Sequence, residues 1–513
     1  MRTLRYSSLY FLWLIISLLG AIPTYAQYSP DSTYYFGKHL GFKQPRALPP
    51  SAFALKEHGY ETAKKPWKAA LETFTINAGV WAFDRFILDA DFARINAGTI
   101  SHNLRQGFVW DNDKFSTNLF AHPYHGGLYF NAARANGMNF WESVPYAAGG
   151  SLMWEFLAER EPAALNDWIA TTIGGAALGE VTNRLSLLLI DESERGMARV
   201  GREIAAFIAS PIRGLNRMLS GDMFRTKPNR FKHHDFLRLP VRLDIGIGSR
   251  YLADDRHFFR GEHAPYLNIN MTYGDPFRVE NNSPYDYFTL NLTASLSKNQ
   301  PLISEVNLTG KLWSTPIRIN PRIDMTFGVY QHFNYYDSEP IIKDVSATPY
   351  KISEAASVGA GAIFRFPYEG KETHIEQRLF ASAVLLGGSL SDYYHVIDRN
   401  YNMGSGFSFH SSTNISLGEW ASIRLTLKQL NLFTWKGYTS ENLSNTNPLY
   451  LNSQGDRSRA RLTVLRARIK AKIKPGWSIG IDTQYYLRQT NYKFQEDINY
   501  RTFETRIGLY CHF

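Results

Sequence analysis

Apolar and polar residues alternate with a period of two from about residue 236 to the end of the chain. Because successive side chains of a β-strand point to opposite faces, this pattern predicts strands that each have one apolar face. In the segment 288–296, for example, one face carries Phe288, Leu290, Leu292, Ala294 and Leu296, and the other carries Thr289, Asn291, Thr293 and Ser295. Segments of this kind predict about twelve strands, near residues 238, 265, 286, 303, 319, 355, 374, 403, 420, 459, 476 and 501.

The region from about residue 67 to 225 has helical spacing instead, with Gly and Pro between its apolar runs. Helices are predicted over residues 68–88, 123–136, 143–159, 166–190 and 194–219. The apolar run 173–190 carries Glu180, Asn183 and Arg184, which are costly in lipid, so we expect a helix packed within protein. The last helix has one apolar side and several arginines elsewhere, which fits either packing under a barrel or lying on a membrane surface.

The first 26 residues have the features of a secretory signal peptide: Arg2 and Arg5, a short apolar stretch and a small-residue cleavage site at Ala26. Residues 27–66 are polar and contain prolines, which predicts an extended periplasmic segment. The sequence has one cysteine, Cys511, so no disulfide can form within the chain. Export from the cytoplasm is therefore expected.

The strand series favours a closed membrane barrel over a two-layer sandwich. Aromatic residues make up 14% of the chain, and membrane barrels use such residues in girdles at the two lipid boundaries. The last strand alternates and ends on Phe513, which resembles the terminal signature of barrels folded by the outer-membrane assembly machinery. The predicted fold class is α+β, with an N-terminal helical domain (67–225) followed by an antiparallel transmembrane β-barrel (236–513) of about 12 strands.

The predicted location is the outer membrane, with its lipid and the barrel assembly machinery as partners. The helical domain is too large to fit inside such a barrel, so we expect it to pack at the mouth on the periplasmic side. The formal net charge is +10, which fits contact with anionic lipid or glycan. Nucleic acid is not expected as a partner, because no motif that reads it is present.

One wall of the predicted lumen is basic, because cations occupy the polar face of two strands: Arg424, Lys428, Arg466, Arg468, Lys470 and Lys472. In an open pore, this wall would attract anionic solutes. In a filled lumen, it would neutralise acidic residues such as Glu305, Asp324, Glu376 and Asp482. The filled lumen is favoured because barrels of this size are often narrow or occluded.

The helical region holds the densest group of polar side chains, and its candidate catalytic residues are His122, His125, Glu142, Glu155, Asp167 and Glu180. His122 and His125 are three residues apart and are candidate metal ligands, although Pro123 between them also fits a capping role for His122. The carboxylates suit general acid-base chemistry, but Arg134 and Arg184 are available partners for a buried structural network. No serine triad or phosphate-binding loop is present, and no cofactor is predicted.

A distinctive string of residues resembles a family of Gram-negative outer-membrane proteins that bears only a domain-of-unknown-function label. The string comprises Trp110 to Asp113, Asn118, His122-Pro123-Tyr124, Gly126, Tyr129, Ala133-Arg134, Gly137, Glu142-Ser143, Trp154-Glu155, Asp167, Gly179-Glu180 and the stretch 213–217. The resemblance covers roughly residues 70–225 and implies an envelope protein with a helical region before a barrel. It implies no activity.

Two kinds of function follow from these features. The first is a non-enzymatic envelope component with a structural, binding or transport role, which the strand series and the lack of a complete catalytic motif favour. The alternative is an envelope hydrolase or transferase that acts on lipid or glycan through the polar residues of the helical domain.

Overall fold

The structure is a computed structural model. It describes residues 64–110, 113–226, 241–254, 258–277, 283–320, 323–342, 347–367, 373–394, 400–435, 437, 445 and 456–512. The predicted signal peptide and all but the last three residues of the predicted extended segment lie outside these ranges.

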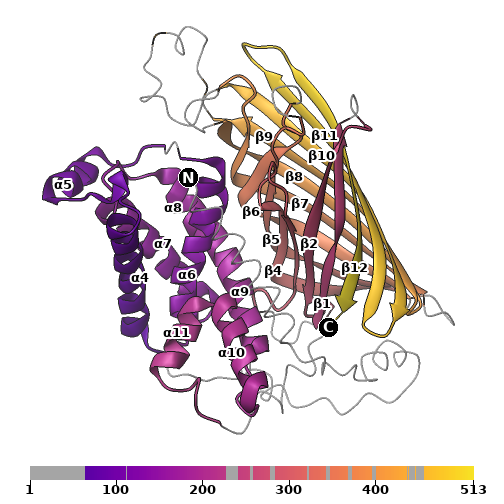
Figure 1. The fold of residues 1–513 in the computed structure, drawn as a ribbon, viewed down its shortest axis with the longest axis horizontal. Coiled ribbons are helices and arrows are strands. Elements are labelled where there is room, and N and C mark those ends of the chain that lie inside the picture. The colour runs from indigo at the N-terminus through magenta and orange to yellow at the C-terminus, as the bar shows by residue number, and fades with distance from the viewer. Residues whose placement is uncertain are drawn as a thin grey trace.

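Twelve strands form one closed antiparallel barrel, in which β1 pairs with β12 (Figure 1). The strands are β1 (Val241–Asp254), β2 (Glu262–Tyr273), β3 (Phe288–Ser295), β4 (Ile303–Asn320), β5 (Ile323–Asp337), β6 (Lys351–Pro367), β7 (Thr373–Leu390), β8 (Tyr401–Leu417), β9 (Ala421–Thr434), β10 (Ser458–Lys474), β11 (Trp477–Tyr492) and β12 (Ile498–His512). The predicted fold class, a helical region followed by an antiparallel barrel of about twelve strands, is confirmed.

The outward-facing side chains of the strands are largely apolar, whereas the lumen holds polar and charged side chains beside an apolar cluster that includes Leu430, Leu462 and Tyr486. In β11, Ile479 and Ile481 are 46% and 49% exposed, whereas the alternating residues Asp482 and Gln484 are 1% and 0% exposed. A barrel built to dissolve in water buries its apolar face and exposes its polar face. This barrel does the reverse, which is the arrangement that a surrounding of lipid requires.

The helices precede the barrel in the chain. They are α4 (Pro66–Phe86), α5 (Ala97–Gln106), α6 (His122–Ala135), α7 (Phe140–Leu157), α8 (Leu165–Ile169), α9 (Gly175–Leu189), α10 (Gly196–Ala209) and α11 (Pro211–Leu219). The sequence did not predict α5, and the predicted helices 166–190 and 194–219 are each interrupted. A π-helical turn, η3 (Ala170–Gly174), separates α8 from α9, and α11 starts anew at Pro211, whose ring suits a first turn. Within the described ranges, no helix combines the length and apolarity that a bilayer crossing needs.

The helical domain packs against the outer wall of the barrel. On β5, Phe327 and Val329 face outward and are 40% and 37% exposed, while Phe333 and Tyr335 on the same face are 0% and 2% exposed. The ring of Phe115 covers Tyr335 at a centroid distance of 5.3 Å. Figure 1 shows the helices standing beside the strands. The expectation that the helices pack at a barrel mouth is therefore wrong.

The contact between the two parts extends from one end of the wall toward the other. At the end where both barrel termini lie, Arg184 of α9 donates to the carbonyl of Pro284, which precedes β3. At the opposite end, the ring of Trp110 packs at a tilt against that of Trp435, which follows β9, with ring centroids 4.5 Å apart. The alternation in the sequence did not predict this contact. Apolar side chains that face a helix and apolar side chains that face lipid produce the same pattern along a strand.

Candidate functional site

Three of the candidate residues converge inside the helical domain. His122 begins α6, Glu155 lies in the last turn of α7, and Asp167 lies in α8. One side-chain ligand atom from each lies within 4.8 Å of the other two. The His122 Nε2 and Asp167 Oδ2 atoms are 3.8 Å apart. We call this group the His122–Glu155–Asp167 cluster.

Neighbouring donors orient the two carboxylates of the His122–Glu155–Asp167 cluster. The backbone N–H of Ala164 donates to Glu155 Oε2 over 2.8 Å, and the Asn166 side chain donates to Asp167 Oδ1 over 2.7 Å. The second carboxylate oxygen of Asp167, Oδ2, is the one that faces His122. Glu155 and Asp167 are buried, while the His122 side chain keeps 14% of its surface exposed.

Two irregular helix turns flank the His122–Glu155–Asp167 cluster. The π-helical turn η2 (Thr117–Ala121) ends immediately before His122, and η3 begins three residues after Asp167. Turns of this type often occur at functional sites, because they shift side chains out of regular helical positions. Helix α6 also approaches η3 very closely: a Cβ on Gly126 of α6 would lie 1.9 Å from the backbone oxygen of Thr171 in η3. Glycine at this position therefore lets the start of α6 lie against η3.

His125 does not join the His122–Glu155–Asp167 cluster, although the sequence paired it with His122. Its ring packs on Tyr129 and edge-on against Trp154, with ring centroids 4.6 Å and 5.2 Å away. Burial, with a smaller contribution from neighbouring His122, lowers the pKa of His125 to about 3. The imidazole of His125 is therefore neutral at physiological pH.

The other two carboxylates stabilise the fold. Glu142 forms a capping box with Asn139 at the start of α7 and an ion pair with Lys64 of 2.7 Å. The hydrogen bond from Lys64 and that from the Asn139 backbone lower the pKa of Glu142. Glu180 is fully buried and pairs with Arg134 at 2.7 Å and with Arg184 at 2.8 Å. These pairs are the structural network that the sequence offered as the alternative to catalysis.

Three of the six residues of the predicted basic wall contact Asp482 or Asp244 in the barrel lumen. Arg466 and Arg468 both contact Asp482, at 2.5 Å and 2.6 Å. Lys470 contacts Asp244 at 2.6 Å. The remaining three residues lie elsewhere along the polar faces: Lys428 donates to Asn307 and Asn334, Lys472 pairs with Glu419 near a strand end, and Arg424 lies opposite Arg468 in the β9–β10 register.

Ion pairs also join strands on opposite sides of the barrel. Arg466 of β10 contacts Glu305 of β4 at 2.8 Å, and these strands are six positions apart in the ring of twelve. Arg506 of β12 contacts the same Glu305 at 3.0 Å. Side chains from facing walls thus meet across the lumen and fill it at this level.

A second set of lumen residues was missed from the sequence. Glu504 binds Arg250 at 2.8 Å and Arg506, and it accepts hydrogen bonds from the hydroxyls of Tyr350 and Tyr486. The signal was available, because Glu504 and Arg506 occupy the polar positions of a strand whose apolar positions were recognised.

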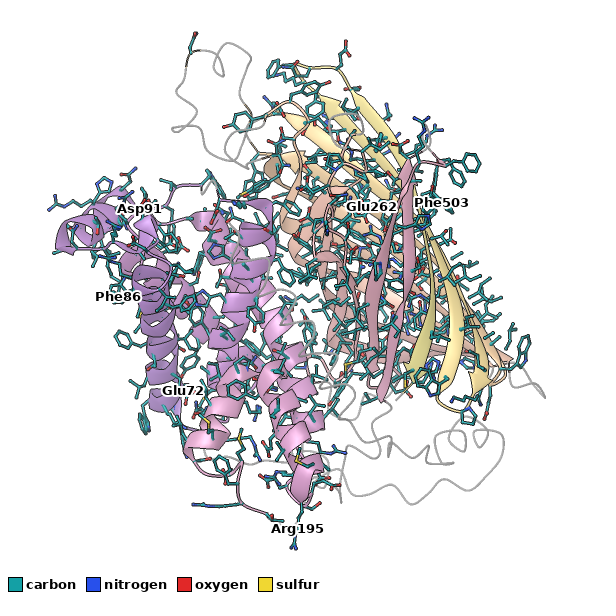
Figure 2. All side chains as sticks on the ribbon, in the orientation of Figure 1. Glu72, Phe86, Asp91, Arg195, Glu262 and Phe503 are labelled. Carbon is teal, nitrogen blue, oxygen red and sulfur yellow. The ribbon has the colours of Figure 1, made fainter. Side chains whose placement is uncertain are left out.

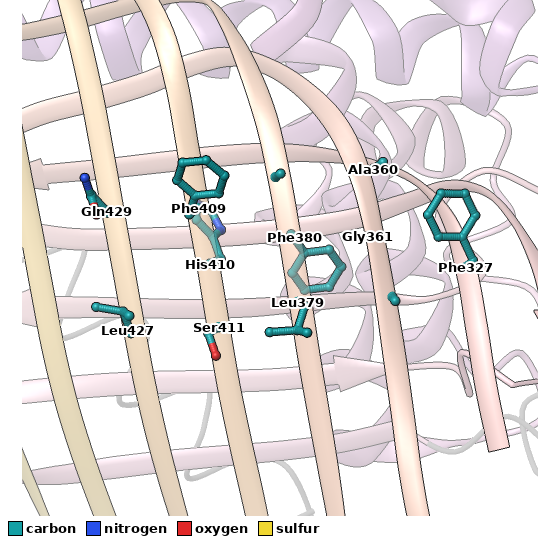
Figure 3. Close-up of a pocket in the computed structure, with 12 residues that line it drawn as sticks. Phe327, Ala360, Gly361, Leu379, Phe380, Phe409, His410, Ser411, Leu427 and Gln429 are labelled. Carbon is teal, nitrogen blue, oxygen red and sulfur yellow. The ribbon is translucent and has the colours of Figure 1, made fainter. Parts of the chain in front are cut away.

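The outer wall carries a shallow hollow of about 450 Å³ across strands β5 to β9 (Figure 3). Phe327, Leu379, Phe409 and Leu427 line it, together with small residues such as Ala360. Its lining suits acyl chains rather than a polar ligand.

The helical residues that form the His122–Glu155–Asp167 cluster also carry the family signal. Residues 107–212 match the model of a family described as a domain of unknown function, DUF3943. This match confirms the resemblance noted in the sequence, and the matched segment includes all three residues of the cluster. No curated protein matches the chain.

Several solved outer-membrane proteins are similar to about half of the chain. The NanC porin is 9% identical, with a TM-score of 0.26 over 52% of this chain and 98% of its own. The outer-membrane protein Omp33 of Acinetobacter baumannii is 8% identical, with a TM-score of 0.21 over 53% of this chain and 99% of its own. An anion-selective porin from Comamonas acidovorans is 8% identical, with a TM-score of 0.17 over 54% and 99%.

Proposed function

We propose that this protein is a non-enzymatic outer-membrane component: a barrel with a closed lumen that holds the DUF3943 domain against its outer wall as a structural or binding module. The ion pair between Arg466 and Glu305 carries this proposal, because it joins opposite walls of the barrel. Outer-membrane lipid would contact the apolar outer wall, and the barrel assembly machinery would insert the strands.

The orientation of the barrel follows from its connections. Membrane barrels have short turns on the periplasmic side and longer loops outside. The short turns here, from Leu417 to Ala421 and from Lys474 to Trp477, lie at the end that also holds both barrel termini. We assign this end to the periplasm. The end of the helical domain that carries Arg195 lies on this side, opposite the end that carries Asp91 (Figure 2).

The closed lumen predicts that the purified protein does not conduct ions. In planar bilayers, full-length protein should produce no sustained channel openings above those of a protein-free control, although a known porin inserted under the same conditions conducts. Folding is checked by the difference in gel mobility between boiled and unboiled samples. Steady conductance of the folded protein would show that the lumen is open and that the transport alternative holds.

The helical domain is proposed to lie at the level of the membrane beside the barrel, because it covers outward-facing residues of the strands. Its outer helix, α4, supports this placement. Trp67, Leu71, Phe74 and Phe83 are 52–69% exposed, and the two charged residues between Pro66 and Phe83, Lys68 and Glu72, pair with each other at 3.4 Å. An apolar face of this extent indicates a nonpolar neighbour. The lipid that surrounds the barrel wall would supply it.

Spin labels test this placement. In a Cys511→Ser background, a label at Phe74→Cys should collide more with oxygen, which concentrates in lipid, than with a water-soluble nickel chelate. A matched label at the exposed Arg195→Cys position should show the opposite preference. If the label at position 74 prefers the nickel chelate, α4 faces water and the helical domain lies outside the membrane. This result leaves the conductance test unaffected.

The convergence of His122, Glu155 and Asp167 favours a second candidate function, an envelope enzyme acting on lipid or glycan. The three residues offer an imidazole and two carboxylates, which suit acid-base or metal-assisted hydrolysis. A His122→Ala protein that folds normally and fully restores a deletion strain would remove this candidate.

A further inference from the structure

We propose that His122, Glu155 and Asp167 bind one divalent transition-metal ion within the DUF3943 domain. This proposal is independent of the closed lumen, because its residues come from α6, α7 and α8 and not from the barrel. It is also distinct from the sequence-based pairing of His122 with His125. The structure replaces His125 with two carboxylates that lie far from His122 in the chain.

The spacing of the ligand atoms fits a metal-free site whose ligands move slightly closer together when the ion binds. Ligand atoms bound to one zinc ion at about 2.0–2.2 Å lie roughly 3.4 Å from each other in a tetrahedral arrangement. The His122 Nε2 and Asp167 Oδ2 atoms are 3.8 Å apart, and all three ligand atoms are within 4.8 Å. Small side-chain rotations that move the ligand atoms by less than the length of a carbon–carbon bond would bring these atoms to coordinating distance.

The donor types determine the class of ion. One imidazole nitrogen with two carboxylate oxygens suits zinc, manganese or iron in the divalent state, whereas all-oxygen sites suit magnesium or calcium. The charge of a divalent cation matches that of the two buried carboxylates together. Glu155 and Asp167 have 1% and 3% of their surface exposed, so they lie well away from bulk water.

The surrounding hydrogen bonds match those around metal ligands. A ligating carboxylate is commonly held by a hydrogen bond to its other oxygen, which fixes its direction. Here the Ala164 N–H holds one oxygen of Glu155, and Asn166 holds Oδ1 of Asp167. Three protein ligands leave at least one coordination position for water or a bound group, as in metal sites that act on ligands. The partly exposed side of His122 provides the access.

Metal titration of the purified full-length protein tests the proposal. After treatment with a chelator and its removal, wild-type protein in detergent should bind about one equivalent of Zn²⁺ by calorimetry. His122→Ala and Asp167→Asn should weaken this binding by at least about 10- to 100-fold, the range seen when only an outer partner of a metal ligand is lost. Co²⁺ serves as a spectroscopic probe, and its visible absorption should change in His122→Ala.

His102→Ala is the matched control, because His102 is an exposed histidine of the helical region, on α5. It should leave Zn²⁺ binding at the wild-type level. Gel mobility and the helical circular dichroism show that each variant is folded, and His122→Ala decides the outcome if a carboxylate variant does not fold. No saturable binding by wild type, or equal binding by wild type and His122→Ala, overturns the proposal.

Discussion

Glu180→Ala is expected to destabilise the helical domain by about 3–5 kcal/mol, the cost of removing one partner from a buried ion pair. Glu180 is fully buried and holds both Arg134 and Arg184. Its removal leaves two arginines without their shared counter-charge in a place that water does not reach. Because Arg184 also donates to Pro284 beside the barrel, the change should loosen the helical domain from the wall as well.

Limited proteolysis and urea unfolding, followed by helical circular dichroism, measure this effect. The helical domain of Glu180→Ala should be cleaved at lower protease concentration, while the barrel keeps its heat-dependent gel mobility. Glu161→Ala is the control, since Glu161 is half exposed and its pair with Arg160 lies at the surface. If both variants unfold at the same urea concentration, the buried network does not stabilise the domain.

The strands could be predicted because lipid outside and a polar lumen inside impose a strict alternation. The same alternation places Arg466 and Arg468 on the lumen side of β10, and it places Glu504 and Arg506 on the lumen side of β12. What alternation cannot show is which lumen residues meet across the barrel. That depends on closure and register: Arg466 reaches Glu305 only because β4 and β10 face each other in a ring of twelve strands.

The candidate site was predictable as a set of residues but not as a geometry. Glu142 stands three residues after Asn139, a capping-box spacing that marks it as structural from the sequence alone. Glu180 and Arg184 have the spacing of a helical ion pair. Glu155 and Asp167 have no such local signal. Their meeting with His122 requires the close approach of α6 to η3 at Gly126, which is a tertiary feature.

Glu305→Ala is expected to cost the barrel about 3–5 kcal/mol, again because a buried charge pair loses one member. Glu305 is 1% exposed and contacts Arg466 and Arg506 at 2.8 Å and 3.0 Å. Without it, two arginines inside the lumen lose a shared partner. Urea-dependent unfolding and refolding of the barrel in lipid vesicles, followed by tryptophan fluorescence, measures the loss. Glu305→Gln keeps the size and the acceptor oxygen of the side chain, so it should be less damaging.

The same variant links stability to the closed lumen. Loss of the Glu305 carboxylate removes the ion pair between β4 and β10 and one negative charge beside Arg466 and Arg506, so folded Glu305→Ala should admit anions in the bilayer assay where wild type does not. Glu419→Ala is the control, because Glu419 is 49% exposed and pairs with Lys472 near a strand end. It should change neither stability nor conductance. If Glu305→Ala is as stable as Glu419→Ala and, like it, does not conduct ions, the ion pairs across the lumen neither stabilise the barrel nor close it.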